Sequence, residues 1–308
     1  YKYAQALLGT ADQEKADAIM SEYFGYEVNT PKFIANLVAN VPYNYEIQTM
    51  AVKTSNGDFG MSFYGDKVVF ASYRNGNSKE FGWNNKPYLD LYSAELDEKQ
   101  MLTKVTPFPS EINTKTHESN ATFSQDGRIM YFNRTNEKMI KIGKEKVANI
   151  KIFKAEFVDG KWTNIKALPF CSDEFSTEHP VLSKDGKKLY FSSDMPGTLG
   201  SFDIFVVDVN EDGTFGTPVN MGNAINTIHR EQFPEISNDG TVLYFASDGH
   251  QGIGGLDIFM SKSYDGVFAK PINLGATING GADDFAYVVK KKKNKGYFSK
   301  KESASAFG

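Results

Sequence analysis

Three of the four histidines in the chain lie close to a glutamate, and these pairs are the first candidates for chemistry. Imidazole and carboxylate groups are ligands of divalent metals, so a ring of such pairs could hold a metal or a cationic group. The alternative is that each acid accepts hydrogen bonds from neighbouring backbone or side chains. We favour the second interpretation and predict no metal and no cofactor. The pairs are His117 with Glu118, His179 with Glu178 and His229 with Glu231, and Asp283 and Asp284 lie at the matching point further along the chain.

The sequence lacks the familiar motifs of catalysis. There is no Gly-x-Ser-x-Gly motif, and no histidine stands in a context that suggests pairing with a serine and an acid. Cys171 is the only cysteine, which excludes an intrachain disulfide and a cysteine-based zinc site. The glycine-rich stretch 249–255 lies between two expected strands, with no helix to bind a phosphate. We therefore expect a protein that is not an enzyme.

Composition limits the partners. The 34 basic and 38 acidic residues leave a net charge of −4, which does not favour nucleic acid or an anionic membrane. No apolar run is long enough to span a membrane directly, and the run Lys290 to Lys293 is interpreted as a solvated turn. The chain begins with Tyr1 rather than Met, which suggests a processed protein or an excised fragment.

The candidate residues are positioned by an internal repeat. SKDGKKLYF starts at Ser183 and SNDGTVLYF at Ser237, a spacing of 54 residues, and SQDGRIMYF starts at Ser124. SFDIFVV from Ser201 and GLDIFMS from Gly255 repeat with the same spacing. With weaker copies at both ends, five units are countable, over residues 57–112, 118–175, 178–228, 231–281 and 284 to the end.

Each unit is predicted to form four antiparallel strands, which we name A to D. Asp-Gly pairs such as Asp185-Gly186 and Asp212-Gly213 mark the tight A–B and C–D turns. Units of this kind cannot bury both faces alone, and closing them into a ring protects their edges. The expected fold is an all-β propeller of about five four-stranded blades, with six as the alternative. The fifth unit lacks a C strand, and Glu46 to Thr54 is predicted to supply a closing strand.

A different pattern precedes the repeats. Apolar residues at helical spacing in residues 1–26, and Thr30 followed by Pro31 as an N-cap and first helical residue, predict a short helical lead-in. We divide the chain into a helical lead-in over 1–45, possibly the end of a tetratricopeptide-like domain, and a propeller over 46–308.

The B–C loops are long and irregular, whereas the A–B and C–D turns are short, so the face that carries the B–C loops is the expected binding face. Phe81 and Trp83 lie among polar residues in the longest loop of the first unit and are candidate hot spots for a protein partner. The same face holds the starts of the A strands, at the mouth of the central channel. The other candidate partner-binding or ligand-binding residues there are Arg74, Arg134, Glu118, Glu178, His179, Glu231 and Asp284.

The units also resemble the TolB-like propeller repeats of multidomain OmpA-family envelope proteins of Bacteroidota. The residues that carry the resemblance are 178–205, 231–259 and PINLGATING at 271–280, together with the opening DFGMSFYGDKVVFAS from Asp58. The resemblance covers residues 57–308 well and the helical region loosely. It implies a periplasmic, outer-membrane-associated protein, and the layout is similar to a component of the type IX secretion system. Peptidoglycan binding belongs to an OmpA-like domain that this chain does not contain.

These observations favour a non-catalytic scaffold that docks a protein partner, such as an outer-membrane β-barrel or a secretion component, through the face with the long B–C loops. The alternative is binding of a small ligand or a peptidoglycan or glycan fragment at the channel mouth, with Glu118, Glu178 and Glu231. A hydrolase or lyase with a metal in the channel is the third possibility.

Overall fold

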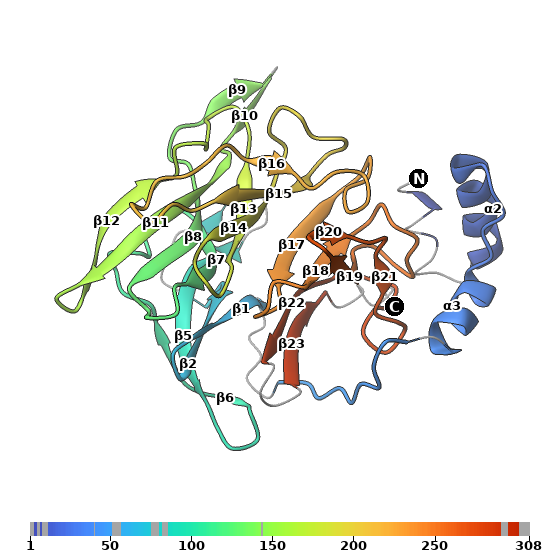
Figure 1. Cartoon of the computed structure of the whole chain (residues 1–308), viewed down its shortest axis with the longest axis horizontal. Coiled ribbons are helices and arrows are strands. Elements are labelled where there is room, and N and C mark those ends of the chain that lie inside the picture. The colour runs from blue at the N-terminus through green and yellow to red at the C-terminus, as the bar shows by residue number, and fades with distance from the viewer. Residues whose placement is uncertain are drawn as a thin grey trace.

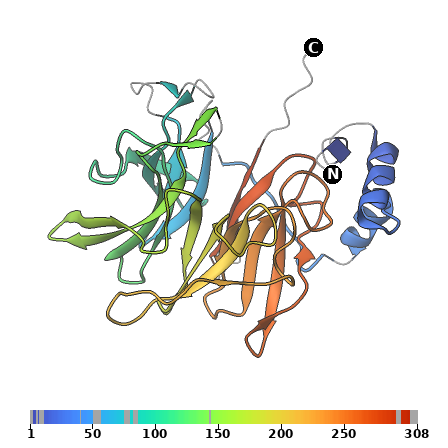
Figure 2. The same cartoon turned by 90° about the horizontal axis from the view of Figure 1, so that it is seen from above.

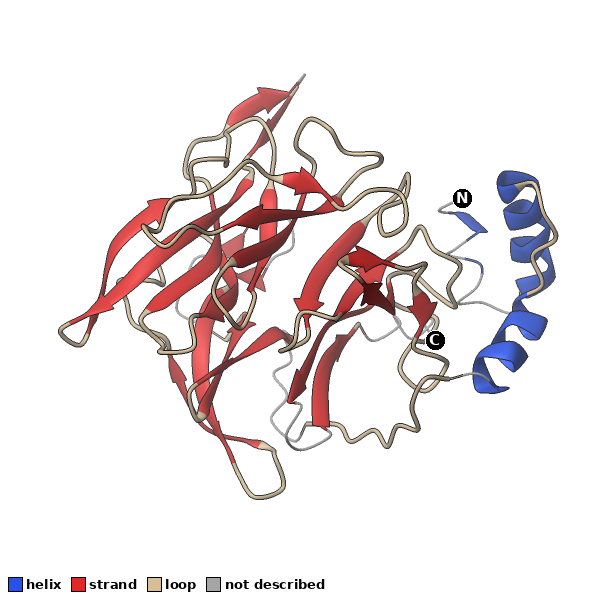
Figure 3. Cartoon of the chain, in the orientation of Figure 1, coloured by secondary structure: helices blue, strands red, loops and turns tan. Residues whose placement is uncertain are grey.

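Strands are the main secondary structure in the computed structural model, as predicted, and the helices α2 and α3 lie at one side (Figure 3). The structure describes residues 3–4, 7, 12–39, 41–50, 57–74, 80–81, 86–142, 144–290 and 295–301. In the first four repeats an Asp-Gly or Gly-Asp turn separates the first two strands, and the glycine adopts a positive φ that other residues rarely adopt, as at Gly186 (φ 74°) and Gly240 (φ 71°).

Four sheets of four or five strands form the body of the molecule (Figure 1). The first sheet contains β1 (Asp58–Tyr64), β2 (Lys67–Ser72), β5 (Asp90–Leu96) and β6 (Leu102–Pro107), and the second contains β7 (Glu118–Phe123), β8 (Ile129–Thr135), β11 (Ile150–Val158) and β12 (Lys161–Ala167). The third contains β13 (Thr177–Leu182), β14 (Lys188–Ser193), β15 (Asp203–Asp208) and β16 (Val219–Asn220). The fourth contains β17 (Glu231–Ile236), β18 (Val242–Ser247), β19 (Asp257–Tyr264), β20 (Val267–Phe268) and β21 (Ile272–Asn273).

A further sheet pairs β22 (Asp284–Lys290) with β23 (Lys295–Lys300). Two small hairpins, β3 (Glu80–Phe81) with β4 (Lys86–Pro87) and β9 (Ile140–Ile142) with β10 (Glu145–Val147), lie inside B–C loops.

The inner A strands β1, β7, β13, β17 and β22 share one irregularity. Each has a β-bulge at the same place in its pairing with the B strand, because two residues of the A strand take up one step of the ladder. Each bulge contains a residue with a φ between 42° and 67°; these residues are Gly60, Asn120, His179, Phe233 and Ala286. The A strands also contact one another in sequence, and β22 contacts both β17 and β1. The sheets are therefore arranged radially, and the predicted propeller-like fold is confirmed.

Apolar side chains between neighbouring sheets form the core. Tyr131 of β8 packs with Leu189 and Phe191 of β14, for example, and Tyr190 packs with Leu243 and Phe245 of the next sheet. The packing joins each blade to its neighbour, so residues of the B strands are among the most buried of the chain.

Helices α2 (Gln13–Phe24) and α3 (Thr30–Ala39) lie beside the sheet that contains β17 to β21 in both views (Figures 1 and 2). The predicted helix at Thr30 exists, but Thr30 does not cap it. The Oδ1 of Asn29 accepts the backbone N–H of Lys32 at 2.9 Å, and the Thr30 hydroxyl donates to Asp17 instead. Asn29 is the capping residue, because the helix begins one position earlier than predicted.

Residues 46–50, where we predicted the start of a closing strand, are not in a strand, and 51–54 lie outside the described residues. Instead of pairing with a sheet, the segment packs by its side chains. Tyr45 lies against the apolar cluster of Tyr244, Tyr287 and Phe298, and Met50 lies against the cluster of the first sheet.

Candidate functional site

The B–C loops emerge at the end of the sheets where the A strands begin, because the first residue of each A strand pairs with the end of its B strand. We call this end the long-loop face. It carries the connections over 73–89, 136–149, 194–202 and 248–256, and the β9–β10 hairpin projects from it at the top of Figure 1. The opposite end carries the short Asp-Gly turns. The predicted difference in loop length is present.

Buried carboxylates anchor the connections that lead into the A strands. Glu118, which is fully buried, accepts the backbone N–H of Thr114 at 3.0 Å and its hydroxyl at 2.6 Å. Glu231 accepts the same two groups of Thr227, at 2.7 and 2.8 Å. Asp284 accepts the N–H of Gly280 at 2.6 Å. In each case the donor lies four residues before the acid, so the carboxylate holds a tight loop at the base of the face.

Burial changes the acidity of these groups. It raises the pKa of Glu231 to about 7, and it raises the pKa of Glu118 and of Asp284, although hydrogen bonds and nearby cations oppose the shift. Their side chains have no contact with solvent, so a ligand could reach them only after the loops that they hold had moved.

Arg74 and Arg134 are paired within their own sheets. Arg74 lies 2.5 Å from Asp58, over the rings of Phe70 and Tyr92. Arg134 lies 2.9 Å from Glu118 and also donates to the carbonyl of Ile112 at 2.7 Å. Both side chains are mostly buried, so their guanidinium groups stabilise the ends of β2 and β8.

Glu178 and His179 are consecutive buried residues of the A strand β13. The Nε2 of Gln232 donates to Glu178 Oε1 at 2.5 Å, and His179 Nδ1 lies 3.6 Å from the same oxygen. Burial raises the pKa of Glu178 to about 7 and lowers that of His179 to about 3, so near neutral pH the imidazole is uncharged. The His179 ring stacks on Phe233 with 3.6 Å between centroids. The imidazole is therefore packed against an aromatic ring of the neighbouring A strand β17.

The other predicted acids begin other A strands: Glu118 begins β7, Glu231 begins β17 and Asp284 begins β22. Across the described residues, no three histidine, cysteine, aspartate or glutamate side chains are grouped so as to hold a metal. His117 accepts the N–H of Leu89 on Nδ1 at 3.0 Å, and His229 lies 3.0 Å from the hydroxyl of Tyr23 in α2. His117 thus contacts the connection before β5, and His229 contacts the helical lead-in.

The aspartates that begin strand C hold the long loops. Asp203 accepts the N–H of Leu199 at 2.7 Å, and Asp257 accepts the N–H of Ile253 at 2.5 Å. Asparagines of the fourth strands, Asn220 and Asn273, also donate to them. These are loop-stabilising hydrogen bonds of the kind that the sequence suggested. Burial raises the pKa of Asp257 to about 7.

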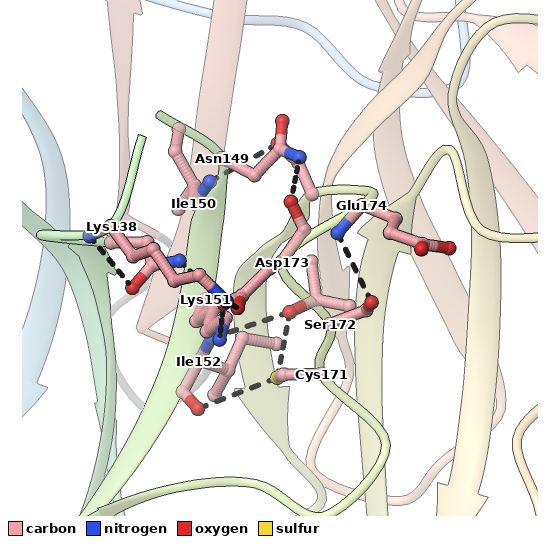
Figure 4. Close-up of polar contacts among 12 residues, drawn as sticks. Lys138, Asn149, Ile150, Lys151, Ile152, Cys171, Ser172, Asp173 and Glu174 are labelled. Carbon is pink, nitrogen blue, oxygen red and sulfur yellow. Dashed lines mark hydrogen bonds and ion pairs between the residues drawn. The ribbon is translucent and has the colours of Figure 1, made fainter. Parts of the chain in front are cut away.

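Asp173 also holds a long loop, but in this unit the strand-C position carries a lysine and Asp173 supplies the carboxylate. The sequence analysis did not identify Asp173. Lys151 occupies the place of the strand-C aspartate, and its Nζ lies 2.5 Å from Asp173 (Figure 4). Asn136 and Lys138 of the B–C loop donate to the same carboxylate, at 2.6 and 2.8 Å. These donors hold the pKa of Asp173 well below its usual range. The sequence signal that could have revealed it is Lys151, which replaces the aspartate of the Asp-Ile-Phe motif in the second unit.

The structure describes only one of the two aromatic candidates. Phe81 lies in β3, opposite Lys86 of β4, so its backbone belongs to a hairpin on the long-loop face. Trp83 lies outside the described residues. The hot-spot prediction for these two residues therefore stays a prediction.

No family model and no curated protein matches the chain. Among solved structures, the chain is similar to an endo-arabinase from Bacteroides thetaiotaomicron, with a TM-score of 0.50 and 13% identity over 81% of this chain and 90% of the other. It is also similar to a putative TolB from Agrobacterium tumefaciens (TM-score 0.45, 15% identity, 78% and 72%) and to TolB from Acinetobacter baumannii (TM-score 0.43, 19% identity, 72% and 44%). The chain spans less than half the length of the latter. The likeness to the endo-arabinase concerns the fold alone. None of the described helices is long and apolar enough to cross a membrane.

Proposed function

We propose that this chain is a non-catalytic binding propeller that docks a protein partner through the long-loop face. One observation carries the proposal: this face has loops of unequal length, and buried carboxylates accept hydrogen bonds from the backbone of those loops and of the neighbouring connections. Preorganised loops lose less conformational entropy on binding, and variation in their length shapes a surface for a particular partner. The polar groups that would be candidates for catalysis are already used in holding those loops.

The setting is proposed from the sequence resemblance. The resemblance to TolB-like repeats of OmpA-family proteins supports a periplasmic protein associated with the outer membrane, and we propose a β-barrel or a type IX secretion component as its partner. We also propose that β22 and β23 are the inner strands of a fifth blade. Two facts support this count: β22 carries the same bulge as the other four A strands, and it contacts both β17 and β1.

The test is a pull-down from envelope extracts with the chain carrying Phe81→Ala and Trp83→Ala. We expect loss of the partner that the unmodified chain recovers. The matched control carries Tyr264→Ala and Val267→Ala, which remove two exposed apolar side chains at a C–D turn on the opposite end. Equal recovery by the loop variant and the control would reject the long-loop face as the docking surface.

Binding of a small ligand at the channel mouth is the competing outcome. It would appear as stabilisation of the unmodified chain against heat by a glycan fragment, with the loop variant stabilised equally. Stabilisation of this kind, without a recovered protein partner, would replace the docking proposal.

A further inference from the structure

The hairpin of β9 and β10 projects from the long-loop face and carries an excess of positive charge (Figure 1). Residues 136–149, which form this B–C loop, include four lysines and two glutamates. The loop is therefore basic, although the whole chain has a net charge of −4. We call residues 136–149 the basic hairpin. Its lysines, all exposed, are Lys138, Lys141, Lys144 and Lys146.

Two of these lysines lie face to face. Lys141 of β9 pairs directly with Lys146 of β10. Residues directly opposite each other in an antiparallel pair have Cβ atoms about 5 Å apart and point to the same face, so like charges there repel. Within the described part of the chain, no ion pair joins Lys141, Lys144 or Lys146 to an acid. A negative group placed between the two paired lysines would remove their repulsion.

The opposite face of the hairpin is apolar. Ile140 pairs with Val147, and both side chains are half-buried. Because successive residues of a strand point to opposite faces, the pair of Lys141 and Lys146 is directed away from these apolar side chains. The lysine pair is the more exposed of the two, so it is the face that a partner can reach.

The base of the hairpin is tied to the body of the protein. The backbone N–H of Asn136 donates to the carbonyl of Asn149 at 2.8 Å, which closes the loop. The Asn136 side chain donates to the Asp173 carboxylate at 2.6 Å, and the Asn149 side chain donates to the Asp173 carbonyl at 2.8 Å (Figure 4). Lys138 belongs to the same anchor, since its Nζ lies 2.8 Å from Asp173. The lysine pair beyond this anchor is therefore presented on a preorganised support, which lowers the entropy lost on binding.

The charge of the whole chain distinguishes extended from local anionic partners. An exposed charge acts over about 8 Å at physiological salt. A nucleic acid or an anionic membrane carries negative charge far beyond the hairpin and would also face the rest of a chain that is net negative. A short acidic segment on a protein surface would face the lysines alone. The observations favour the acidic protein segment.

We propose that the basic hairpin binds an acidic segment of the protein partner, with a carboxylate between Lys141 and Lys146. The inference rests on the proposed function, because the hairpin is part of the long-loop face. It deepens that proposal by naming the chemistry of the partner, which is rich in carboxylates where it meets this loop. Charge complementarity of this kind sets the orientation of a complex and speeds its formation.

The probe is a fluorescent peptide of alternating acids, EDSDE, titrated at low salt with the full chain while anisotropy is measured. We expect saturable binding that weakens as the salt concentration rises, because exposed charges are screened. Binding should be weaker by about ten-fold or more for the chain with Lys141→Glu and Lys146→Glu. Failure of the peptide to bind the unmodified chain would overturn the proposal.

The matched control carries Lys161→Glu and Lys184→Glu. These two exposed lysines lie at turns on the end opposite the long-loop face, and their replacement changes the net charge by the same amount. The control should bind the peptide as the unmodified chain does. Equal loss of binding in the control and the hairpin variant would show an effect of net charge alone and would overturn the proposal.

Lys146→Glu alone tests the lysine pair itself. It places a carboxylate opposite Lys141 and so replaces repulsion with attraction. We expect slower amide exchange in β9 and β10 together with weaker binding of the peptide. Lysines that are only solvated would give neither change, and that result would overturn the proposal.

Membrane binding is the competing outcome. Phosphatidylglycerol vesicles that bind the chain, and that lose it in the variant with Lys141→Glu and Lys146→Glu while the peptide does not bind, would assign the hairpin to a lipid surface and overturn the proposal.

Failure of this inference and failure of the proposed function are distinguishable, because the peptide assay requires no partner. If the peptide binds through the lysine pair while the pull-down rejects Phe81 and Trp83, the aromatic loop falls and the hairpin stands. If the pull-down gives the expected loss and the peptide does not bind, only the acidic character of the partner is overturned.

Discussion

Replacing Glu178 with glutamine should make the protein more stable at alkaline pH without changing it at acid pH. Glu178 is 6% exposed, and burial raises its pKa from 4.5 to about 7. Below pH 4.5 the carboxyl is protonated in both the folded and the unfolded chain. As the pH rises from 4.5 to 7 the unfolded chain releases the proton first, so the free energy of unfolding falls over this window.

The shift corresponds to about 3 kcal/mol at pH 8, since one pKa unit is worth about 1.4 kcal/mol. Glutamine keeps an acceptor oxygen for Gln232 and carries no charge. We therefore expect Glu178→Gln to match the unmodified protein within about 1 kcal/mol at pH 5 and to exceed its stability by up to about 3 kcal/mol at pH 8.

The assay is urea denaturation followed by fluorescence at pH 5, 6, 7 and 8. Other titrating groups contribute equally to both proteins, so the difference between the two curves isolates Glu178. Glu174→Gln, at an exposed position four residues earlier, is the control and should give no pH-dependent difference. A constant difference between Glu178→Gln and the unmodified protein at all four pH values would refute the reasoning.

Three other substitutions test separate parts of the structure. Asp173→Asn should lower the urea midpoint at pH 7, because Lys151 loses its partner, and the deficit should shrink as the pH falls and the native carboxyl becomes protonated. Phe245→Ala should cost about 3 to 5 kcal/mol in denaturant unfolding, since it leaves a cavity between two blades, and a loss below about 1 kcal/mol would contradict the described packing. Tyr23→Phe removes the hydroxyl that contacts His229, and it should speed amide exchange in α2 with no change in the strands; equal acceleration throughout would argue against a local contact.

The blades could be predicted because their signals are local. The turn at Asp185-Gly186 needs a glycine with a positive φ, and the strands on either side follow from apolar patterns of a few residues. Repetition of those patterns 54 residues apart then implies stacked equivalent units. The loop-stabilising role of Asp203 and Asp257 could also be predicted, because both residues repeat in register with their loops.

The bulges show where local patterns fall short. Phe233 and Ala286 adopt a positive φ although neither residue favours it, and no sequence signal marks them. The conformation occurs at the bulges of strands that pack against neighbouring A strands from other parts of the chain. The predicted closing strand is absent over residues 46–50 for a related reason: Tyr45, just before it, packs by its side chain against Tyr244 and Tyr287, which a strand pattern does not encode.

The sequence alone was sufficient for the repeat, the strand order within a unit and the contrast between long loops and short turns, since each depends on neighbours in the chain. Only the tertiary structure assigned partners to the charged groups. Glu118 and Arg134 were separate candidates for the binding face, and the structure shows that they pair across 2.9 Å because their strands lie side by side. Whether a carboxylate is a ligand or a loop anchor depends on which donors the fold brings within hydrogen-bonding distance, and those donors come from other parts of the chain.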